Sequence, residues 1–154
     1  MGEPLRIRTA TKADLPALID LYRHLIVADT PCTEDRAPVI FEQFLRYPGS
    51  AILLGECGQD LAASCTLVVI PNLTRGGKPY ALIENVVTHA DFRNRGFGKS
   101  LLHAATEHAW KAGCYKVMLM TGSNRASTLA FYEAAGFEQS KTGFQIRRTA
   151  PRED

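Results

Sequence analysis

The sequence predicts an α/β domain organised around one strand–loop–helix–strand unit, and three observations lead to this prediction. Residues 81–88 are rich in aliphatic and β-branched side chains and are long enough for one buried strand. A glycine-containing loop, residues 93–99, follows, and the apolar residues after it recur at helical spacing. Residues 115–121 are a second dense apolar run, which predicts a right-handed crossover between two parallel strands.

Length and composition limit what this chain is. Its 154 residues are expected to form a single domain, residues 1–154, large enough to bury most of its apolar surface without the help of disulfide bonds or structural metals. Charged residues make up 22% and hydrophobic residues 45%, which is ordinary for a globular protein. The net charge of +2 is too small to indicate a nucleic-acid or membrane partner. No run of about 18 apolar residues is present, so no transmembrane helix is expected.

The cysteines give no sign of a metal site or a disulfide. Cys32, Cys57, Cys65 and Cys114 contain no C-x-x-C pair, and three of them lie in or beside apolar runs. Reduced thiols in the cytoplasm are therefore expected. The first residues also lack the basic-then-apolar pattern of a secretion signal.

The N-terminal region predicts a strand and an amphipathic helix. Residues 5–9 alternate between polar and apolar side chains, as a strand does. Thr11 and Asp14 resemble a capping box, with Asp in place of the usual Glu. The apolar residues that follow keep a helical spacing until Asp-Thr-Pro at 29–31: Leu15, Leu18, Ile19, Tyr22, Leu25 and Ile26.

The next part of the chain predicts a helix and a hairpin. Residues 34–47 suggest a second helix, which a Pro-Gly pair stops. Residues 51–57 and 61–70 predict two strands joined by a short link rich in turn formers. The link at residues 71–79 is longer and polar, and its two cations are expected in water.

One acidic residue interrupts the apolar strand at residues 81–88. Strict alternation predicts that Glu84 shares a face with Val86, while Asn85 and Val87 lie on the opposite face. An acid inside an apolar strand is costly to bury unpaired, so Glu84 is expected to have a partner or a chemical role. Burial would raise its pKa toward the range of a base. A structural, hydrogen-bonding carboxylate and a catalytic base both remain open.

The glycine loop predicts an anion site. The first N–H groups of a helix have no partner within it, and the helix dipole makes that end partly positive. Gly96 and Gly98 remove side chains that would keep a ligand from those amides, and three cations lie in the same loop. Such a site suits a phosphate or pyrophosphate. A structural turn with glycine at a tight corner is the plainer alternative.

Other phosphate loops do not fit the spacing. A Walker loop needs G-x-x-x-x-G-K-[ST], whereas Gly96 and Gly98 are separated by a single residue. A dinucleotide fingerprint needs a third glycine, where this chain has Leu101.

The remaining elements follow in order. The helix after the loop is expected to run to Gly113, which suits a left-handed C-terminal cap. After residues 115–121 a last helix is expected to reach Ala135 and to be closed by Gly136. Residues 144–147 predict a final strand.

The spacing Arg93-x-x-Gly96-x-Gly98 resembles the [Q/R]-x-x-G-x-[G/A] acetyl-coenzyme A loop of the GNAT superfamily of N-acetyltransferases. Several ordered motifs at family spacing are more specific than one loop. The resemblance covers residues 80–148 well and the first half only in its order of elements. It continues through residues 113–116, 131–133, 136–137 and 145–147.

The resemblance implies an α/β (α+β) GNAT fold with a single N-acetyltransferase domain. The sheet is expected to be mixed and mostly antiparallel, with six to seven strands, about four flanking helices and a splay between the fourth and fifth strands. Acetyl-coenzyme A, the implied co-substrate, would lie in that splay, within residues 80–148, and no metal is implied. The residues implied to contact it are Val86, Val87, Thr88, Arg93, Asn94, Arg95, Gly96, Phe97, Gly98, Lys99, Ser100, Asn124, Phe131 and Tyr132.

The resemblance also implies an enzyme in which a small-molecule primary amine attacks the thioester directly. Glu84 matches an acidic position assigned to proton removal, directly or through water. The Val87 backbone amide matches the position that polarises the thioester carbonyl. Tyr132 matches the tyrosine that donates a proton to the departing thiolate, and a phenol with a pKa near ~10 is protonated at neutral pH.

The acceptor is not fixed by the sequence. The C-terminal half looks most like glucosamine-phosphate N-acetyltransferases, but those carry an acid after the glutamate, where this chain has Asn85. Aminosugars, amino acids, polyamines and protein amines all remain open. In the family the region of the second helix borders the acceptor pocket, which makes Tyr22, His24, Phe41 and Phe44 candidates. Core packing for the aromatic residues and a solvated surface for His24 are the plainer interpretation.

Other classes of function also remain open. A coenzyme A-binding regulatory module without catalysis is one, and a protein or peptide amine acetyltransferase is another. Nucleic-acid binding would rest only on a short basic tail, Arg147, Arg148 and Arg152, so no specific nucleic-acid partner is expected. A homodimer is kept as a hypothesis.

Overall fold

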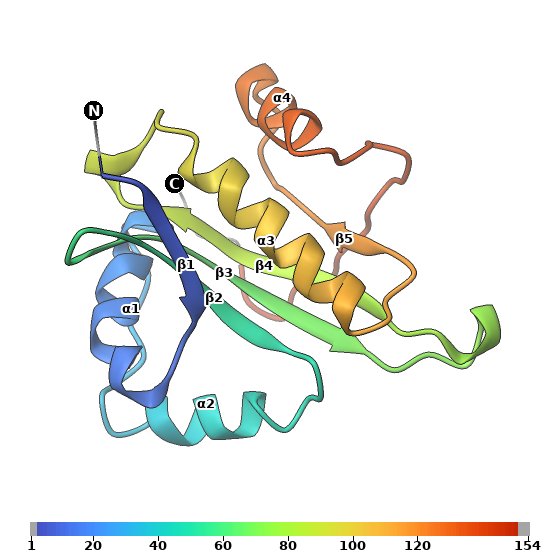
Figure 1. Ribbon diagram of the computed structural model, residues 1–154, viewed down its shortest axis with the longest axis horizontal. Coiled ribbons are helices and arrows are strands. Elements are labelled where there is room, and N and C mark those ends of the chain that lie inside the picture. Colours follow the sequence, from blue (N-terminus) through green and yellow to red (C-terminus); the bar gives the residue numbers. More distant parts are fainter. Residues whose placement is uncertain (1–2, 151–154) are drawn as a thin grey trace.

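The computed structural model, which describes residues 3–150, contains one five-stranded sheet in the order β1-β2-β3-β4-β5 (Figure 1). Residues 1, 2 and 151–154, and with them Arg152, lie outside the described residues. The strands are β1 (Leu5–Thr9), β2 (Ala51–Cys57), β3 (Asp60–Ile70), β4 (Tyr80–Thr88) and β5 (Val117–Leu119). The helices are α1 (Leu15–Leu21), α2 (Ala37–Phe44), α3 (Phe97–Lys111) and α4 (Ala126–Ala134). Short 3-10 turns complete the fold: η1 (Lys12–Asp14), η2 (Tyr22–His24), η3 (Arg75–Gly77) and η4 (Ala90–Phe92).

The predicted mixed, mostly antiparallel sheet is confirmed. The first four strands pair with their neighbours in antiparallel fashion, and only β4 and β5 are parallel, with α3 as the crossover between them. The described part of the chain has five strands rather than the expected six to seven. None of its helices is both long and apolar enough to span a membrane.

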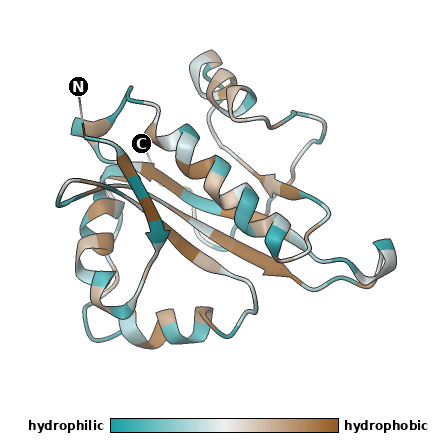
Figure 2. Ribbon diagram, viewed as in Figure 1, coloured by the Kyte–Doolittle hydropathy of each residue, from teal (hydrophilic) through white to brown (hydrophobic). Residues whose placement is uncertain are grey.

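Helices cover both faces of the sheet. On one face, Leu101, Leu102 and Ala105 of α3 are fully buried against alternate residues of the strands, including Ile83 of β4. On the other face, α1 and α2 enclose a smaller apolar cluster around Leu54. Figure 2 shows the strands as the most hydrophobic part of the ribbon, with polar turns at their ends. The sheet therefore lies between two apolar layers, one packed against α3 and the other against α1 and α2.

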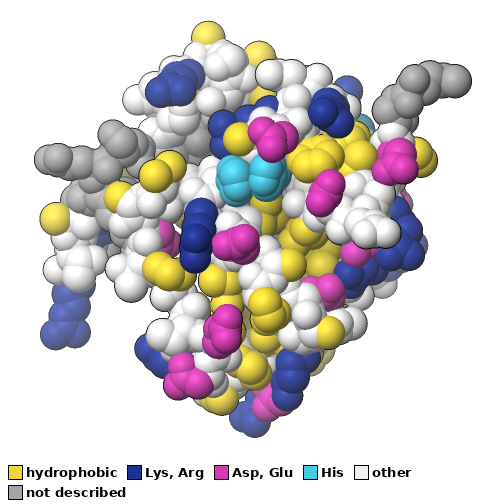
Figure 3. All heavy atoms as spheres, turned by 90° about the vertical axis from the view of Figure 1, so that its left-hand side faces the viewer, with side chains coloured by type: hydrophobic (Ala, Val, Ile, Leu, Met, Phe, Trp, Pro, Cys, Tyr) yellow, Lys and Arg dark blue, Asp and Glu magenta, His cyan; other side chains and the backbone are white. Residues whose placement is uncertain are grey.

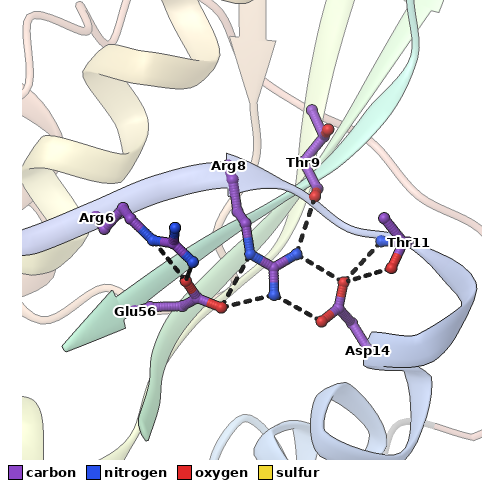
Figure 4. Close-up of polar contacts among 6 residues, drawn as sticks. All are labelled: Arg6, Arg8, Thr9, Thr11, Asp14 and Glu56. Atoms are coloured by element: carbon purple, nitrogen blue, oxygen red, sulfur yellow. Dashed lines mark hydrogen bonds and ion pairs between the residues drawn. The ribbon is translucent and has the colours of Figure 1, made fainter. Parts of the chain in front are cut away.

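A charged network fixes the start of α1 against the sheet (Figure 4). Asp14 Oδ2 accepts the Thr11 backbone N–H at 2.7 Å, which confirms the predicted capping box. The Arg8 guanidinium donates to both oxygens of Asp14 at 2.7 Å and, through Nε, to Glu56 Oε1 at 2.9 Å. These hydrogen bonds hold the pKa values of both carboxyl groups below their ordinary range. The network joins β1, β2 and the first turn before α1.

The strand predicted at residues 115–121 is limited to Val117–Leu119, and the helix predicted at 34–47 to Ala37–Phe44. Two other predicted elements also differ from the structure. The first helix is shorter than its apolar spacing suggests, because the chain tightens into the 3-10 turn η2 at Tyr22. The strand predicted at residues 144–147 is wrong: residues 138–150 contain neither helix nor strand. Phe144 is 93% exposed and Ile146 100% exposed. A strand needs a hydrogen-bonding partner, and alternation of side chains alone does not provide one.

Candidate active site

The edge of β4 is open where the sequence predicts the reaction to occur. The parallel ladder with β5 begins at Ala81↔Val117 and ends at Ile83↔Leu119, whereas β4 itself continues to Thr88. Residues 84–88 therefore have β3 on one side and no strand on the other. This confirms the expected splay between the fourth and fifth strands.

A bulge lies at the start of this open edge. Thr66 pairs with Glu84 and Ser64 with Val87, so that Cys65 alone opposes Asn85 and Val86. Asn85 has a φ of 52°, in the left-handed region that Asn tolerates better than most residues. The extra residue leaves the ladder locally unpaired and moves the side chains that follow to the opposite face of the sheet.

The bulge overturns the predicted arrangement of side chains. Val86 packs against the core beneath α3, on the same side as Ile83, instead of sharing a face with Glu84. Asn85 lines a pocket on the side of α1 and α2. Glu84 is exposed, so it is not an acid buried inside the strand. Glu84 is thus free to meet a ligand from solvent.

The two loop glycines have different structural roles. Gly96 is the N-cap of α3 with a φ of 77°, and no side chain caps the helix. Apart from its chain neighbours, no atom lies within 4 Å of the place where a Gly96 Cβ would stand, so there is open space beside the N-cap of α3. Gly98 instead permits close packing, because a Cβ there would stand 3.0 Å from Cζ of Phe131. Packing therefore explains Gly98, while ligand clearance at Gly96 stays a prediction.

The loop cations partly serve the fold. Arg93 donates through Nε to the Thr88 carbonyl at 3.3 Å and through Nη2 to the His24 carbonyl at 3.1 Å. Arg95 donates to the Asp91 carbonyl at 3.1 Å. All three cations, Lys99 included, keep exposed side chains beside the first turn of α3. Their charge therefore adds to that of the helix dipole.

Tyr132 of α4 lies near the open edge of β4. Its ring centroid is 4.9 Å from that of Phe131, which packs over Gly98. Burial, and then the charge of Glu84, raise the pKa of Tyr132 above its ordinary value. Glu84 and Tyr132 are therefore electrostatic neighbours, as a base and an acid acting on one substrate would be.

The other predicted contact residues surround the same loop. Phe97 and Ser100 belong to the first turn of α3, where the Ser100 N–H donates to the Gly96 carbonyl at 3.1 Å. Asn94 adopts a left-handed φ of 61°. Asn124 is exposed in the segment between β5 and α4. The structure thus brings β4, the loop and α4 together, with Asn124 at the margin.

A pocket of about 430 Å³ lies between α1 and α2 and reaches β4 at Asn85. Of the four acceptor-side candidates, Tyr22, Phe41 and Phe44 line it. His24 does not line the pocket; its ring contacts that of His89 instead. Sequence reasoning missed Asn85 as a pocket residue, although a polar Glu-Asn pair inside an apolar strand is a signal for a bulge.

His24 and His89 lie side by side, with ring centroids 3.9 Å apart. The Nδ1 of His24 accepts the Ala90 N–H at 3.3 Å, and that of His89 accepts the Asp91 N–H at 3.2 Å. Figure 3 shows two histidine side chains in contact on this face, with carboxylates around them. His24 is partly exposed in this pair, and its ring joins the end of η2 to the segment that follows β4.

The thiols are not placed for nucleophilic catalysis. Cys57, Cys65 and Cys114 are buried and free, and Cys32 is exposed. Burial raises the pKa of Cys65 to about 12 and also raises that of Cys114, which disfavours the reactive thiolates. The described residues contain no group of three or more His, Cys, Asp or Glu side chains that could hold a metal ion.

Comparisons with known proteins agree with this geometry. Residues 15–137 match the model of the "Acetyltransferase (GNAT) family". Glucosamine 6-phosphate N-acetyltransferase of Trypanosoma brucei brucei is 30% identical over 142 residues, which cover 86% of this chain and 88% of the relative. A putative acetyltransferase of Agrobacterium tumefaciens has a similar structure, with a TM-score of 0.87 and 45% identity over 93% of this chain and 99% of that one.

A more distant structure has the same fold. Glucosamine-6-phosphate N-acetyltransferase of Arabidopsis thaliana gives a TM-score of 0.84 at 24% identity, covering 96% of this chain and 100% of its own. The open β4 edge, the glycine loop and these matches together show that the chain belongs to the GNAT family of acetyltransferases and is an acyl-CoA-dependent N-acetyltransferase.

Proposed function

We propose that this enzyme moves the acetyl group of acetyl-coenzyme A to the primary amine of a small molecule by direct attack. The observation that carries the proposal is the open edge of β4 at residues 84–88. It begins at the exposed Glu84, whose charge acts on Tyr132, and it ends beside the glycine loop. An acyl donor laid along this edge would meet an anion site at one end and an acid–base pair at the other.

The residues fit coenzyme A in two places. The uncapped amides at Gly96 to Lys99 and the nearby cations suit the pyrophosphate. The main chain of residues 86–88 has no partner strand on its outer side and suits the amide groups of the pantetheine arm. When bound, acetyl-coenzyme A supplies the acetyl thioester.

The protein residues then have distinct tasks. Glu84 accepts a proton from the acceptor ammonium, directly or through water, and the free amine forms the new C–N bond. Val87 pairs with Ser64, and two residues further on, the His89 N–H donates to the Ala62 carbonyl. The Val87 N–H therefore faces β3, and the Val86 and Thr88 N–H groups face the open edge. One of these two outward amides, rather than that of Val87, donates to the oxygen that becomes negative on the thioester carbonyl. As the C–S bond breaks, Tyr132 gives its proton to the departing sulfur. Its raised pKa keeps the phenol protonated until that moment.

Amine-dependent release of free thiol from acetyl-coenzyme A tests the proposal. Wild-type protein should release thiol with at least one amine in a panel of aminosugars, glucosamine 6-phosphate, alkylamines and a lysine peptide. Tyr132→Phe should lower kcat by about 100-fold, because general acid catalysis contributes at least that much. Tyr47→Phe, a change at an exposed tyrosine remote from the loop, is the matched control.

The outcomes separate the alternatives. Binding of acetyl-coenzyme A without thiol release from any amine would support the non-catalytic module instead. Turnover confined to the lysine peptide would support a protein or peptide amine acetyltransferase. Wild-type activity in Tyr132→Phe would remove the proposed proton donor.

We also propose that the enzyme is a homodimer joined through its C-terminal segment. In the described sheet β5 is an outer strand, and outer strands offer unpaired backbone groups. The exposed apolar side chains of Phe144 and Ile146 follow Gly143, where a Cβ would stand 3.4 Å from the Met120 sulfur just beyond β5. Size-exclusion chromatography with light scattering should give the wild-type protein a mass twice the 16.9 kDa of one chain. The Ile146→Glu variant should have the mass of a single chain. The cytoplasmic location stays a prediction.

A further inference from the structure

We propose that the acceptor of this enzyme carries its amine on an apolar body, such as an aryl or alkyl chain, that occupies the pocket between α1 and α2. This inference rests on the proposed function and names the substrate class of the same site. The pocket of about 430 Å³ is within the size range of small-molecule sites. The lining of the pocket differs from that of a site for a phosphorylated aminosugar, which needs charged and polar partners.

The walls of the pocket are apolar and partly open to solvent. They come from α1, the segment after η2, and α2, and include Leu18, Ile19, Leu25, Ile40 and Phe44. Leu25 is 37% exposed and Ile40 45% exposed, so these side chains do not close over a filled core. Figure 3 shows exposed apolar side chains interspersed with acidic and basic ones below the histidine pair. An apolar ligand would remove this surface from water.

The polar end of the pocket lies at the reacting edge of β4. Asn85 of the bulge, Thr66 of β3 and Tyr22 are its polar lining at that end, and Thr66 interacts with the Tyr22 hydroxyl. Thr66 also pairs with Glu84 in the ladder. An amine at this end would therefore lie next to the proposed base, with its apolar body directed away between the helices.

The charges of the pocket do not suit a phosphate. Among the described residues that line it, Arg23 is the one cation, and Arg23 Nε forms an ion pair with Asp20 at 3.4 Å. Arg93, which follows η4, already donates to the Thr88 and His24 carbonyls. A buried phosphate needs several charge-assisted donors, and sugar hydroxyls need partners that aliphatic walls do not give.

The test compares kcat/KM for a series of amines at a saturating concentration of acetyl-coenzyme A. Butylamine, hexylamine and 2-phenylethylamine are measured against glucosamine 6-phosphate. Each additional buried methylene should raise kcat/KM about threefold. The phenyl compound should exceed glucosamine 6-phosphate by at least about tenfold.

Two glutamate variants on α2 provide the structural control. Ile40 lines the pocket, whereas Val39, 56% exposed on the same helix, does not. Ile40→Glu should lower kcat/KM for 2-phenylethylamine by about tenfold or more, since it places a charge in the apolar wall. Val39→Glu should stay within about twofold of wild type, and the affinity of both variants for acetyl-coenzyme A should be unchanged.

Each result decides something different. Acetylation of glucosamine 6-phosphate in preference to every apolar amine, or equal effects of the two variants, would overturn this inference and leave the proposed function intact. If no amine is acetylated, saturation-transfer NMR with 2-phenylethylamine decides the inference. Contact of its ring protons with wild type but not with Ile40→Glu would support it, and no contact with wild type would overturn it. Wild-type protein that neither binds acetyl-coenzyme A nor releases thiol from it would instead contradict the proposed function.

Discussion

Replacement of Gly98 by alanine tests whether the loop positions α4. The new Cβ would stand 3.0 Å from Cζ and 3.2 Å from Cε2 of Phe131. Carbon atoms in favourable contact are about 3.5–4.0 Å apart, so the ring must move by about 0.5 Å. Phe131 is followed by Tyr132, and their rings are 4.9 Å apart. We therefore expect the proposed proton donor to move with the ring.

The expected changes in stability and activity differ in size. Crowding of this kind costs about 1–3 kcal/mol, while alanine favours a helix over glycine by about 1 kcal/mol. The net loss in the free energy of unfolding should therefore stay below about 2 kcal/mol. A displacement of this order in a catalytic group should lower kcat by about tenfold. Gly96→Ala differs: its left-handed φ costs about 1–2 kcal/mol without any contact to Phe131.

The assay combines urea denaturation with kcat for amine-dependent thiol release. The double variant Gly98→Ala, Phe131→Leu removes the ring edge and should recover about half of the lost activity, because adjacent sites couple. A Gly98→Ala enzyme with wild-type kcat would refute the idea that close packing at Gly98 positions Tyr132. A double variant no better than Gly98→Ala would refute it as well.

Two substitutions and one labelling experiment test other parts of the structure. Glu84→Gln removes a charge that raises the pKa of Tyr132, so the alkaline limb of the kcat profile should move to lower pH. Arg8→Met should cost about 2 kcal/mol in urea denaturation, since charge-assisted hydrogen bonds are lost. Because the two carboxyl groups bound by Arg8 have lowered pKa values, wild type should lose this stability as pH falls below about 4, and the variant should lose less. With iodoacetamide at pH 8, native protein should react at Cys32 and not at Cys65; rapid labelling of Cys65 would contradict its burial.

The sequence predicts the strongly patterned parts of this fold well. Four strands lie within about one residue of their predicted positions, since buried strands need continuous or alternating apolar residues. The loop and the start of α3 are also correct, because glycine and a run of periodic apolar residues restrict the local backbone. Family resemblance, rather than periodicity, supplied the splay.

Features that depend on partners far along the chain were not predictable. The bulge at Asn85 arises from the register of β4 on β3, which alternation within one strand does not contain. Residues 144–147 alternate like a strand but find no neighbour in one chain. The contact of His24 with His89 joins segments that no local pattern relates.

Stabilisation by acetyl-coenzyme A tests the central claim most directly. At about 100 times its dissociation constant, a ligand that binds only the folded state adds ~2.7 kcal/mol to stability. For a chain of this size the thermal midpoint should rise by about 5–10 °C. Gly96→Glu, which fills the open space beside the N-cap of α3, should abolish the rise. A saturating concentration that leaves the wild-type midpoint unchanged would contradict the account.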